Sequence, residues 1–136
     1  HEMRRVEGRA IMFFRCFDNT GSYMIDLTLQ VPDELAERIQ PIGPWLPTVI
    51  ELGLLGFRTK AAAVASEVVS FLSTNPSPQQ VVEFQVSDDA QNRLRRLLAL
   101  NSEGLLSEEE SLELDELTQL EHVIIMLKAR VARQKR

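Results

Sequence analysis

Nucleophilic catalysis by a cysteine activated by a histidine is the first chemistry that the reactive side chains could support. The chain has one cysteine, Cys16, and two histidines, His1 and His122, and a thiol activated by an imidazole is a known catalytic arrangement. Cys16 falls in an apolar run, however, where a cysteine is usually buried and unreactive. We expect His122 on a helix surface or at the edge of the core. The chain lacks a phosphate-binding loop, a dinucleotide fingerprint and a nucleophile elbow. The sequence therefore predicts a protein that is not an enzyme.

Metal binding is the second chemistry to consider, because Glu108, Glu109 and Glu110 are consecutive. Neighbouring residues on a helix point about 100° apart, so these carboxylates do not converge on one ion. One cysteine and two histidines are also too few for an ordinary structural zinc site. We expect no metal and no cofactor, and we interpret the glutamates as favourable charges at a helix N-terminus.

Composition excludes several classes of protein. The 136 residues are 44% apolar, 6% aromatic and carry a formal net charge of −5, which suits one globular domain rather than a base-stacking or strongly basic nucleic-acid binder. The longest apolar-rich stretch, residues 39–57, contains three prolines and Glu51, so no membrane span is predicted. A single cysteine cannot form an internal disulfide, which favours a reducing, cytoplasmic location.

Two strands are predicted near the N-terminus. Alternation of apolar and polar residues predicts a strand over residues 23–31. A shorter strand over 11–17 can pair with it as a hairpin, because the turn-forming segment 18–22 separates them. Side chains of the longer strand divide between two faces. One face carries Ile25, Leu27, Leu29 and Val31, and the other carries Asp26, Thr28 and Gln30.

Helices are predicted for most of the remaining chain. Proline and glycine punctuation separates a helix over 33–40 from a second over 47–57. The second helix is apolar nearly all round, which in a small protein usually means burial against a partner chain. Further helical segments are expected over 60–72, 78–84, 88–100 and from 108 to near the end, with Ser107 and Glu110 as a capping box.

The last helix carries a regular apolar seam. Its members alternate in spacing between three and four residues, as in a short coiled coil. They are Leu117, Leu120, Ile124, Leu127 and Val131. Two interpretations stay open: the seam binds a partner protein, or residues 88–134 form a helical hairpin that packs on itself or on a dimer mate.

Residues 24–57 are predicted as a strand, a helix, a turn and a second helix. The strand reads IDLTLQVP, the first helix DELAERIQ and the second helix PTVIELGLLGF. This order resembles the ribbon-helix-helix family of bacterial repressors and antitoxins. In that family two chains pair their strands into a ribbon that enters the DNA major groove, and the second helix points its N-terminus at phosphate. The resemblance implies a homodimer in which a helix beginning at Leu46 faces phosphate. The implied DNA-facing residues are Asp26, Thr28, Gln30, Arg38 and Thr48.

The resemblance also implies an interface. The dimer or partner contacts would be made by Leu27, Leu29, Val31, Leu52 and Leu55 together with the seam residues of the last helix. Between Ser22 and Phe57 the only basic residue is Arg38, and Asp26 is unfavourable beside phosphate. Dimerisation with DNA binding and dimerisation alone therefore both stay open.

Residues 97–136 resemble the helical tail of small, mostly uncharacterised antitoxin-like bacterial proteins, whose genes lie beside nuclease-type genes. The resemblance implies that the C-terminal helices bind a toxin-like or nuclease-like partner protein. The alternative is a structural or adaptor subunit of a larger bacterial complex, in which an acidic surface docks on a basic partner without DNA.

The predicted fold is mainly α with a short β element. A ribbon-helix-helix-like part is followed by a helical hairpin or bundle that ends in a long amphipathic helix. Residues 1–23 are expected to be an extension or a remnant outside the natural product, since Met24 would suit a natural start. The other expected regions are dimerisation 24–74, linker 75–87 and C-terminal hairpin 88–136.

Overall fold

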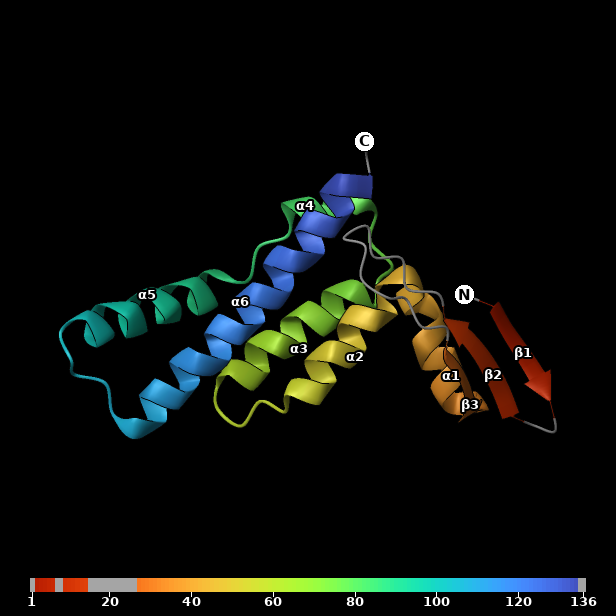
Figure 1. Ribbon diagram of the computed structural model, residues 1–136, viewed down its shortest axis with the longest axis horizontal. Helices are drawn as coiled ribbons and strands as arrows, with labels where there is room; N and C mark the ends of the chain where they lie inside the picture. The colour runs from red at the N-terminus through yellow and green to blue at the C-terminus, as the bar shows by residue number, and fades with distance from the viewer. Residues whose placement is uncertain (1, 7–8, 15–26, 135–136) are drawn as a thin grey trace.

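The computed structural model describes residues 2–6, 9–14 and 27–134. The molecule is elongated, with a small sheet at one end and a helical hairpin at the other (Figure 1). It is mainly helical with a short β element, as the sequence predicts. Of the helices that the structure describes, none combines the length and the apolar run that crossing a membrane requires.

Apart from β1 and η1, which the sequence does not predict, the bounds of the elements agree with the predicted segments to within a few residues. The strands are β1 Glu2–Val6, β2 Arg9–Phe14 and β3 Leu27–Pro32. The helices are α1 Asp33–Ile39, the 3-10 helix η1 Gln40–Trp45, α2 Leu46–Leu55, α3 Ala61–Leu72, α4 Pro78–Glu83, α5 Asp88–Ser102 and α6 Glu108–Gln134.

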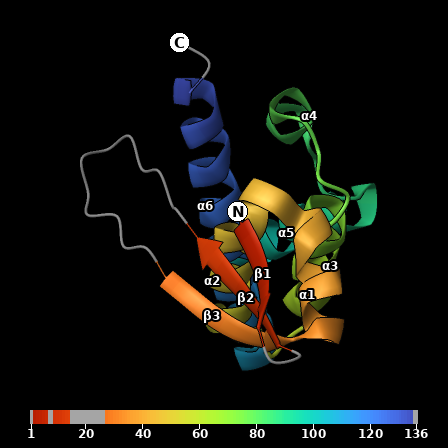
Figure 2. The same ribbon diagram turned by 90° about the vertical axis from the view of Figure 1, so that its right-hand side faces the viewer.

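The sheet is antiparallel, in the order β1-β2-β3. Phe14 pairs with Leu27 and Ala10 with Val31, which confirms the predicted antiparallel pairing of these two strands. The turn predicted at 18–22 lies outside the described residues. β1 lies in the segment expected to be an extension and was not predicted as a strand; it pairs with β2. Helix α1 packs against β2 and β3, which joins the sheet to the helical part (Figure 2).

Helix starts follow local capping rules. The Ser107 hydroxyl accepts from the Glu110 N–H at 3.1 Å, and the Ser107 N–H donates to the Glu110 carboxylate at 3.2 Å. This confirms the predicted capping box of α6. Ser87 caps α5 through the Ala90 N–H, and Ser77 caps α4. These bonds satisfy N–H groups that the first turn of a helix leaves unpaired.

One hydrophobic core joins the two predicted regions. It includes Val31 of β3, Leu52 of α2, Val68 of α3, Val81 of α4 and Val131 of α6. The segment 75–87, which the sequence indicates as a linker, instead contributes α4 and a buried Val81 to this core. A second, smaller cluster of Ala61, Leu97, Leu114 and Leu117 fixes α5 against α6 and α3.

The connection between α1 and α2 depends on Gly43. Its φ of 63° and ψ of −133° place it outside the helical region, in a conformation that side chains rarely adopt. An added Cβ would lie 3.0 Å from the Asn75 Oδ1. Close by, the indole N–H of Trp45 donates to the Pro76 carbonyl at 2.9 Å in a buried contact. The turn is therefore packed directly against the loop after α3.

Candidate functional site

Strand β3, which carries two of the predicted DNA-facing residues, has exposed apolar side chains. Leu27 is 55% exposed and Leu29 is 41% exposed, whereas Val31, on the same face by alternation, is buried. Of the described residues of the predicted apolar face, Val31 alone enters the core, and Ile25 lies outside the described residues. β3 also has β2 on one edge, and no strand within the described residues lies on the other edge.

Helix α2 adds further exposed apolar side chains. The sequence predicts a helix apolar nearly all round, and the structure buries Leu46, Thr48 and Leu52 on one side. The other side remains open to solvent, with Leu54 82% exposed. The exposed residues of this helix also include Ile50 and Leu55. The composition of this helix predicts that a partner chain covers its apolar surface. Within its own chain, this side of the helix stays exposed.

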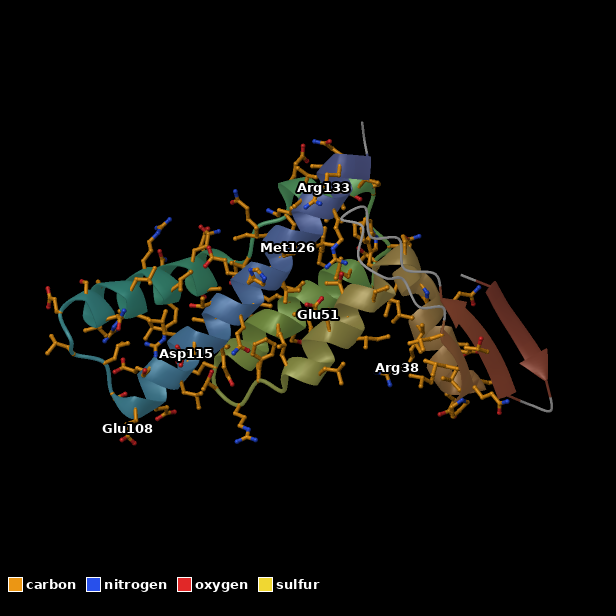
Figure 3. The ribbon with its side chains drawn as sticks, viewed as in Figure 1. Arg38, Glu51, Glu108, Asp115, Met126 and Arg133 are labelled. Carbon is orange, nitrogen blue, oxygen red and sulfur yellow. The ribbon has the colours of Figure 1, made fainter. Side chains whose placement is uncertain are left out.

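The residues predicted to face DNA have different outcomes. Thr28, Gln30 and Arg38 are exposed, and Figure 3 shows Arg38 on α1 at the sheet end of the molecule. Thr48 is only 3% exposed. Its predicted side-chain role is corrected, because a residue on the buried side of α2 cannot present its hydroxyl to phosphate. Asp26 lies outside the described residues.

The width of the sheet bears on DNA binding. The major groove is about 12 Å wide and admits a two-stranded ribbon. Here β3 already carries β2 and β1 on one edge. A dimer formed through the other edge of β3 would have six adjacent strands. The first and the last strand would lie about 24 Å apart, because neighbouring strands are separated by about 4.8 Å. A sheet of this width is wider than the major groove and cannot enter it as a two-stranded ribbon does.

The seam of the last helix is buried within its own chain. Leu120 is 2% exposed, and the other buried members are Leu117, Leu127 and Val131. Ile124 packs partly buried against the same core. Leu52, a further predicted interface residue, is likewise buried. The prediction that these residues contact a partner is corrected. Of the two interpretations of the seam, the structure supports packing on the same chain.

The surface of the C-terminal helices offers other apolar residues. Leu98 on α5, Leu105 in the connection, and Leu112 and Ile125 on α6 are all exposed. The charges along α6 are separated, with Glu108 at the tip of the hairpin and Arg133 at the opposite end (Figure 3). This distribution agrees with a helix dipole that favours acids at its start and bases at its end.

Two long-range carboxylate contacts position α6. Glu113 is buried and accepts from Arg93 of α5 at 2.7 and 3.0 Å. This hydrogen bond raises the pKa of Arg93. Glu116 accepts from the N–H groups of Arg58 and Thr59 and from the Thr59 hydroxyl. Sequence analysis gave Arg93 and Glu116 no role, since no local pattern identifies a partner so far along the chain.

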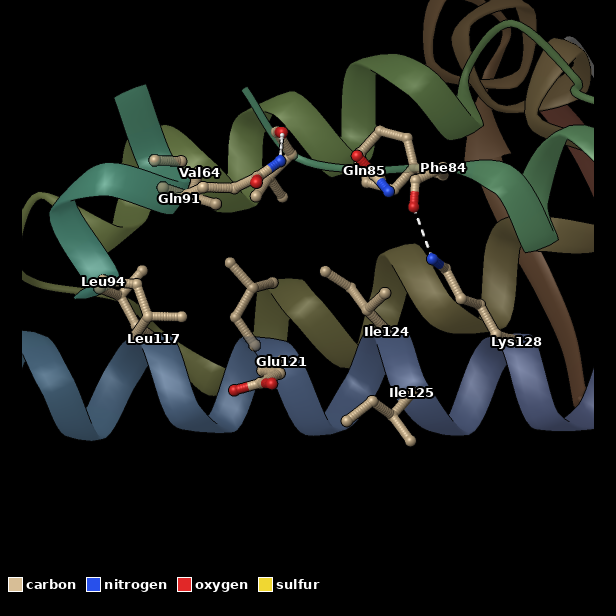
Figure 4. Close-up of a pocket in the computed structure, with 13 residues that line it drawn as sticks. Val64, Phe84, Gln85, Gln91, Leu94, Leu117, Glu121, Ile124, Ile125 and Lys128 are labelled. Atoms are coloured by element: carbon tan, nitrogen blue, oxygen red, sulfur yellow. Dashed lines mark hydrogen bonds between the residues drawn. The ribbon is translucent and has the colours of Figure 1, made fainter. Parts of the chain in front are cut away.

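A groove lies between α5 and α6. Its volume is about 350 Å³, and Val64 of α3 lies at its floor. The extended segment 84–87 borders the groove (Figure 4). That segment is held by two bonds, from the Lys128 ammonium to the Phe84 carbonyl and from the Gln91 amide to the Val86 carbonyl. The apolar seam drew attention to α6, but nothing in the sequence indicated a groove.

The residues considered for catalysis and metal binding do not form a site among the described residues. His122 is exposed on α6, as expected for a surface histidine, and Cys16 and His1 lie outside the described residues. Within residues 27–133, no group of three or more His, Cys, Asp or Glu side chains comes together in a way that could hold a metal ion.

Comparison with protein-family models, with curated proteins and with solved structures finds no match to this chain.

Proposed function

We propose that the protein is a non-enzymatic, homodimeric regulator of the antitoxin type, located in the cytoplasm, which binds a partner protein through its C-terminal helices. The exposed edge of β3 carries this proposal. The order of β3, α1 and α2 is that of a ribbon-helix-helix subunit, and Leu27 and Leu29 extend from the edge strand without cover from the described residues.

The composition of the edge supports pairing between two copies. Proteins usually protect edge strands with charged residues, prolines or covering elements. β3 contains no charged residue, and its one proline, Pro32, is at the C-terminal end of the strand, so the edge from Leu27 to Val31 is unprotected. Two antiparallel copies of β3 can pair about a two-fold axis, which satisfies the free backbone groups of both strands and brings the exposed leucines together.

The same geometry favours dimerisation without DNA in the observed arrangement, because the β1–β2 hairpin widens the sheet beyond the major groove. DNA binding requires this hairpin to leave β3. A salt titration on the gene's own upstream DNA separates the two cases. We expect the full chain to bind this DNA no better than random DNA, and a version beginning at Met24 to gain affinity if the ribbon is a DNA reader.

Light scattering after size-exclusion chromatography tests the dimer. The wild type should have twice the monomer mass of 15.4 kDa. Leu27→Glu combined with Leu29→Glu should give a folded monomer, since both side chains are exposed and four like charges would meet at the interface. Leu105→Glu is the control at another exposed leucine. A wild-type monomer at micromolar concentration contradicts the proposal.

An adaptor subunit is the second candidate, and the formal net charge of −5 favours it because an acidic surface can dock on a basic partner. Capture from a native lysate distinguishes the two. Recovery of a nuclease-type protein supports the antitoxin type, and recovery of a stable assembly of many subunits supports the adaptor.

A further inference from the structure

The groove between α5 and α6 has apolar walls. Leu94 of α5 and Leu117 of α6 lie close together at one end of it (Figure 4). Val64, Leu120 and Ile124 also line it. Small-molecule sites typically have volumes of about 300 to 1,000 Å³ and combine apolar walls with a few polar groups. A volume of about 350 Å³ lies at the lower end of this range. The groove is therefore large enough for one slender apolar ligand.

Lys128 supplies a positive charge at one end of the groove. Its ammonium donates to the Phe84 carbonyl, which leaves two of its three N–H groups for a ligand. No carboxylate of the described chain lies within 4.0 Å of it. The residues three and four positions before and after Lys128 share its face of α6, and all of them are apolar. These are Ile124, Ile125, Val131 and Ala132.

The other charged residue at the groove does not neutralise Lys128. Glu121 is two turns away on α6, and its carboxylate points away from Lys128 (Figure 4). Gln91 uses its amide on the Val86 carbonyl at 2.8 Å. An unneutralised cation beside an apolar slot is complementary to a ligand with one anionic head and one hydrocarbon chain.

We propose that this groove binds a free fatty acid, with the carboxylate on the Lys128 ammonium and the hydrocarbon chain along α6 towards Leu117. From Leu117 to Lys128 the helix rises about 16 Å at 1.5 Å per residue, which suits the extended chain of laurate. The groove has room for one chain, so the ligand is a single-chain carboxylate rather than a two-chain phospholipid. This binding site is independent of the dimer proposed above.

Isothermal titration of the full-length chain with laurate, below its micelle concentration, tests the proposal. We expect one laurate per chain. Each buried methylene strengthens binding about fourfold, so decanoate, with two more methylenes, should bind about 15-fold more tightly than octanoate. Dodecanol and dodecylamine share the chain of laurate but lack its carboxylate, and they should bind at least fivefold more weakly. Vesicles of phosphatidylglycerol should not compete.

Two variants locate the ligand. Lys128→Met keeps an apolar stem and removes the charge, so laurate should bind at least fivefold more weakly while dodecanol is unaffected; Lys60→Met is the matched control at an exposed lysine. Leu94→Trp fills the groove and should reduce binding of both ligands, with folding checked by circular dichroism. Absence of saturable binding overturns the proposal. So does equal affinity for laurate, dodecanol and dodecylamine, or laurate binding that neither variant changes.

Discussion

Glu116 of α6 binds Thr59 in the loop before α3, a residue 57 positions earlier in the chain. Its Oε1 accepts from the Thr59 hydroxyl at 2.6 Å and from the Thr59 N–H at 2.9 Å, and its Oε2 accepts from the Arg58 N–H at 2.9 Å. Burial alone would raise the pKa of Glu116, but the hydrogen bonds from Thr59 and Arg58 hold this pKa below its ordinary value. The contact fixes the loop between α2 and α3 against the last helix.

Glu116→Gln should destabilise the protein by about 2 kcal/mol, because an amide replaces a charged acceptor and directs its own N–H groups towards other donors. Urea unfolding followed by circular dichroism measures this change. Glu121→Gln makes the same chemical change at an exposed position on α6 and should have little effect. Equal stability of the two variants would show that the contact of Glu116 with Arg58 and Thr59 contributes nothing.

The same carboxylate predicts how stability depends on pH. A group whose pKa is lowered by folding contributes stability that is present above its unfolded pKa and is lost as the pH falls through its folded pKa. For Glu116 the loss begins below the ordinary value of 4.5. Between about pH 5 and about pH 3 the unfolding free energy of the wild type should fall more steeply than that of Glu116→Gln. Parallel curves for the two proteins would contradict this prediction.

Arg93→Met should destabilise the protein by about 2 kcal/mol, since it leaves the buried Glu113 carboxylate without its bidentate partner. The figure is below the cost of breaking a fully buried pair because the Arg93 side chain is partly exposed. The double variant Arg93→Met with Glu113→Leu should recover most of the loss. Arg95→Met, at an exposed position, is the control, and thermal unfolding compares all four proteins.

Two glycine substitutions should have opposite effects. Gly43→Ala introduces a Cβ at a positive φ and 3.0 Å from Asn75, so it should cost about 1 to 3 kcal/mol. Gly53→Ala lies within α2, where a Cβ meets nothing within 4 Å, and it should stabilise the helix by about 0.5 to 1 kcal/mol. Chemical denaturation of both variants checks the signs. A Gly43→Ala protein as stable as the wild type contradicts the assigned conformation.

Leu120→Ala tests the position of the seam. If this residue lies in the core of its own chain, truncation should lower stability by about 2 to 5 kcal/mol and leave the oligomeric state of the folded protein unchanged. Leu112→Ala removes the same atoms from an exposed position on the same helix and should be nearly neutral. A change in oligomeric state with unchanged stability would instead show that the seam packs against another chain.

Local features of the fold could be predicted from the sequence. The pairing of β2 with β3, the capping box of Ser107 and Glu110, and the span of α6 each depend on residues close together in the chain. Such signals are strong because capping and turn chemistry act over a few residues. The self-pairing of β3 and the partner of the C-terminal helices stay predictions.

Long-range relationships were not predictable in the same way. An apolar seam at coiled-coil spacing is compatible with a partner chain or with the chain's own helices, and only the packing of α6 on α2, α3, α4 and α5 decides between them. Likewise Thr48 was placed by family resemblance on a face that the core occupies. The contacts of Glu116 and Arg93 join residues 57 and 20 positions apart, which no local pattern encodes.

The position of α6 in the chain has a consequence for synthesis. This helix closes the core that begins at Val31, and it is translated after all the other elements it covers. On the ribosome, the nascent chain must therefore hold the apolar sides of α2, α3 and α4 uncovered until α6 emerges. Nascent chains in that state recruit chaperones and proteases. A translation product that stops before residue 108 should accordingly be degraded rather than accumulate as a folded fragment.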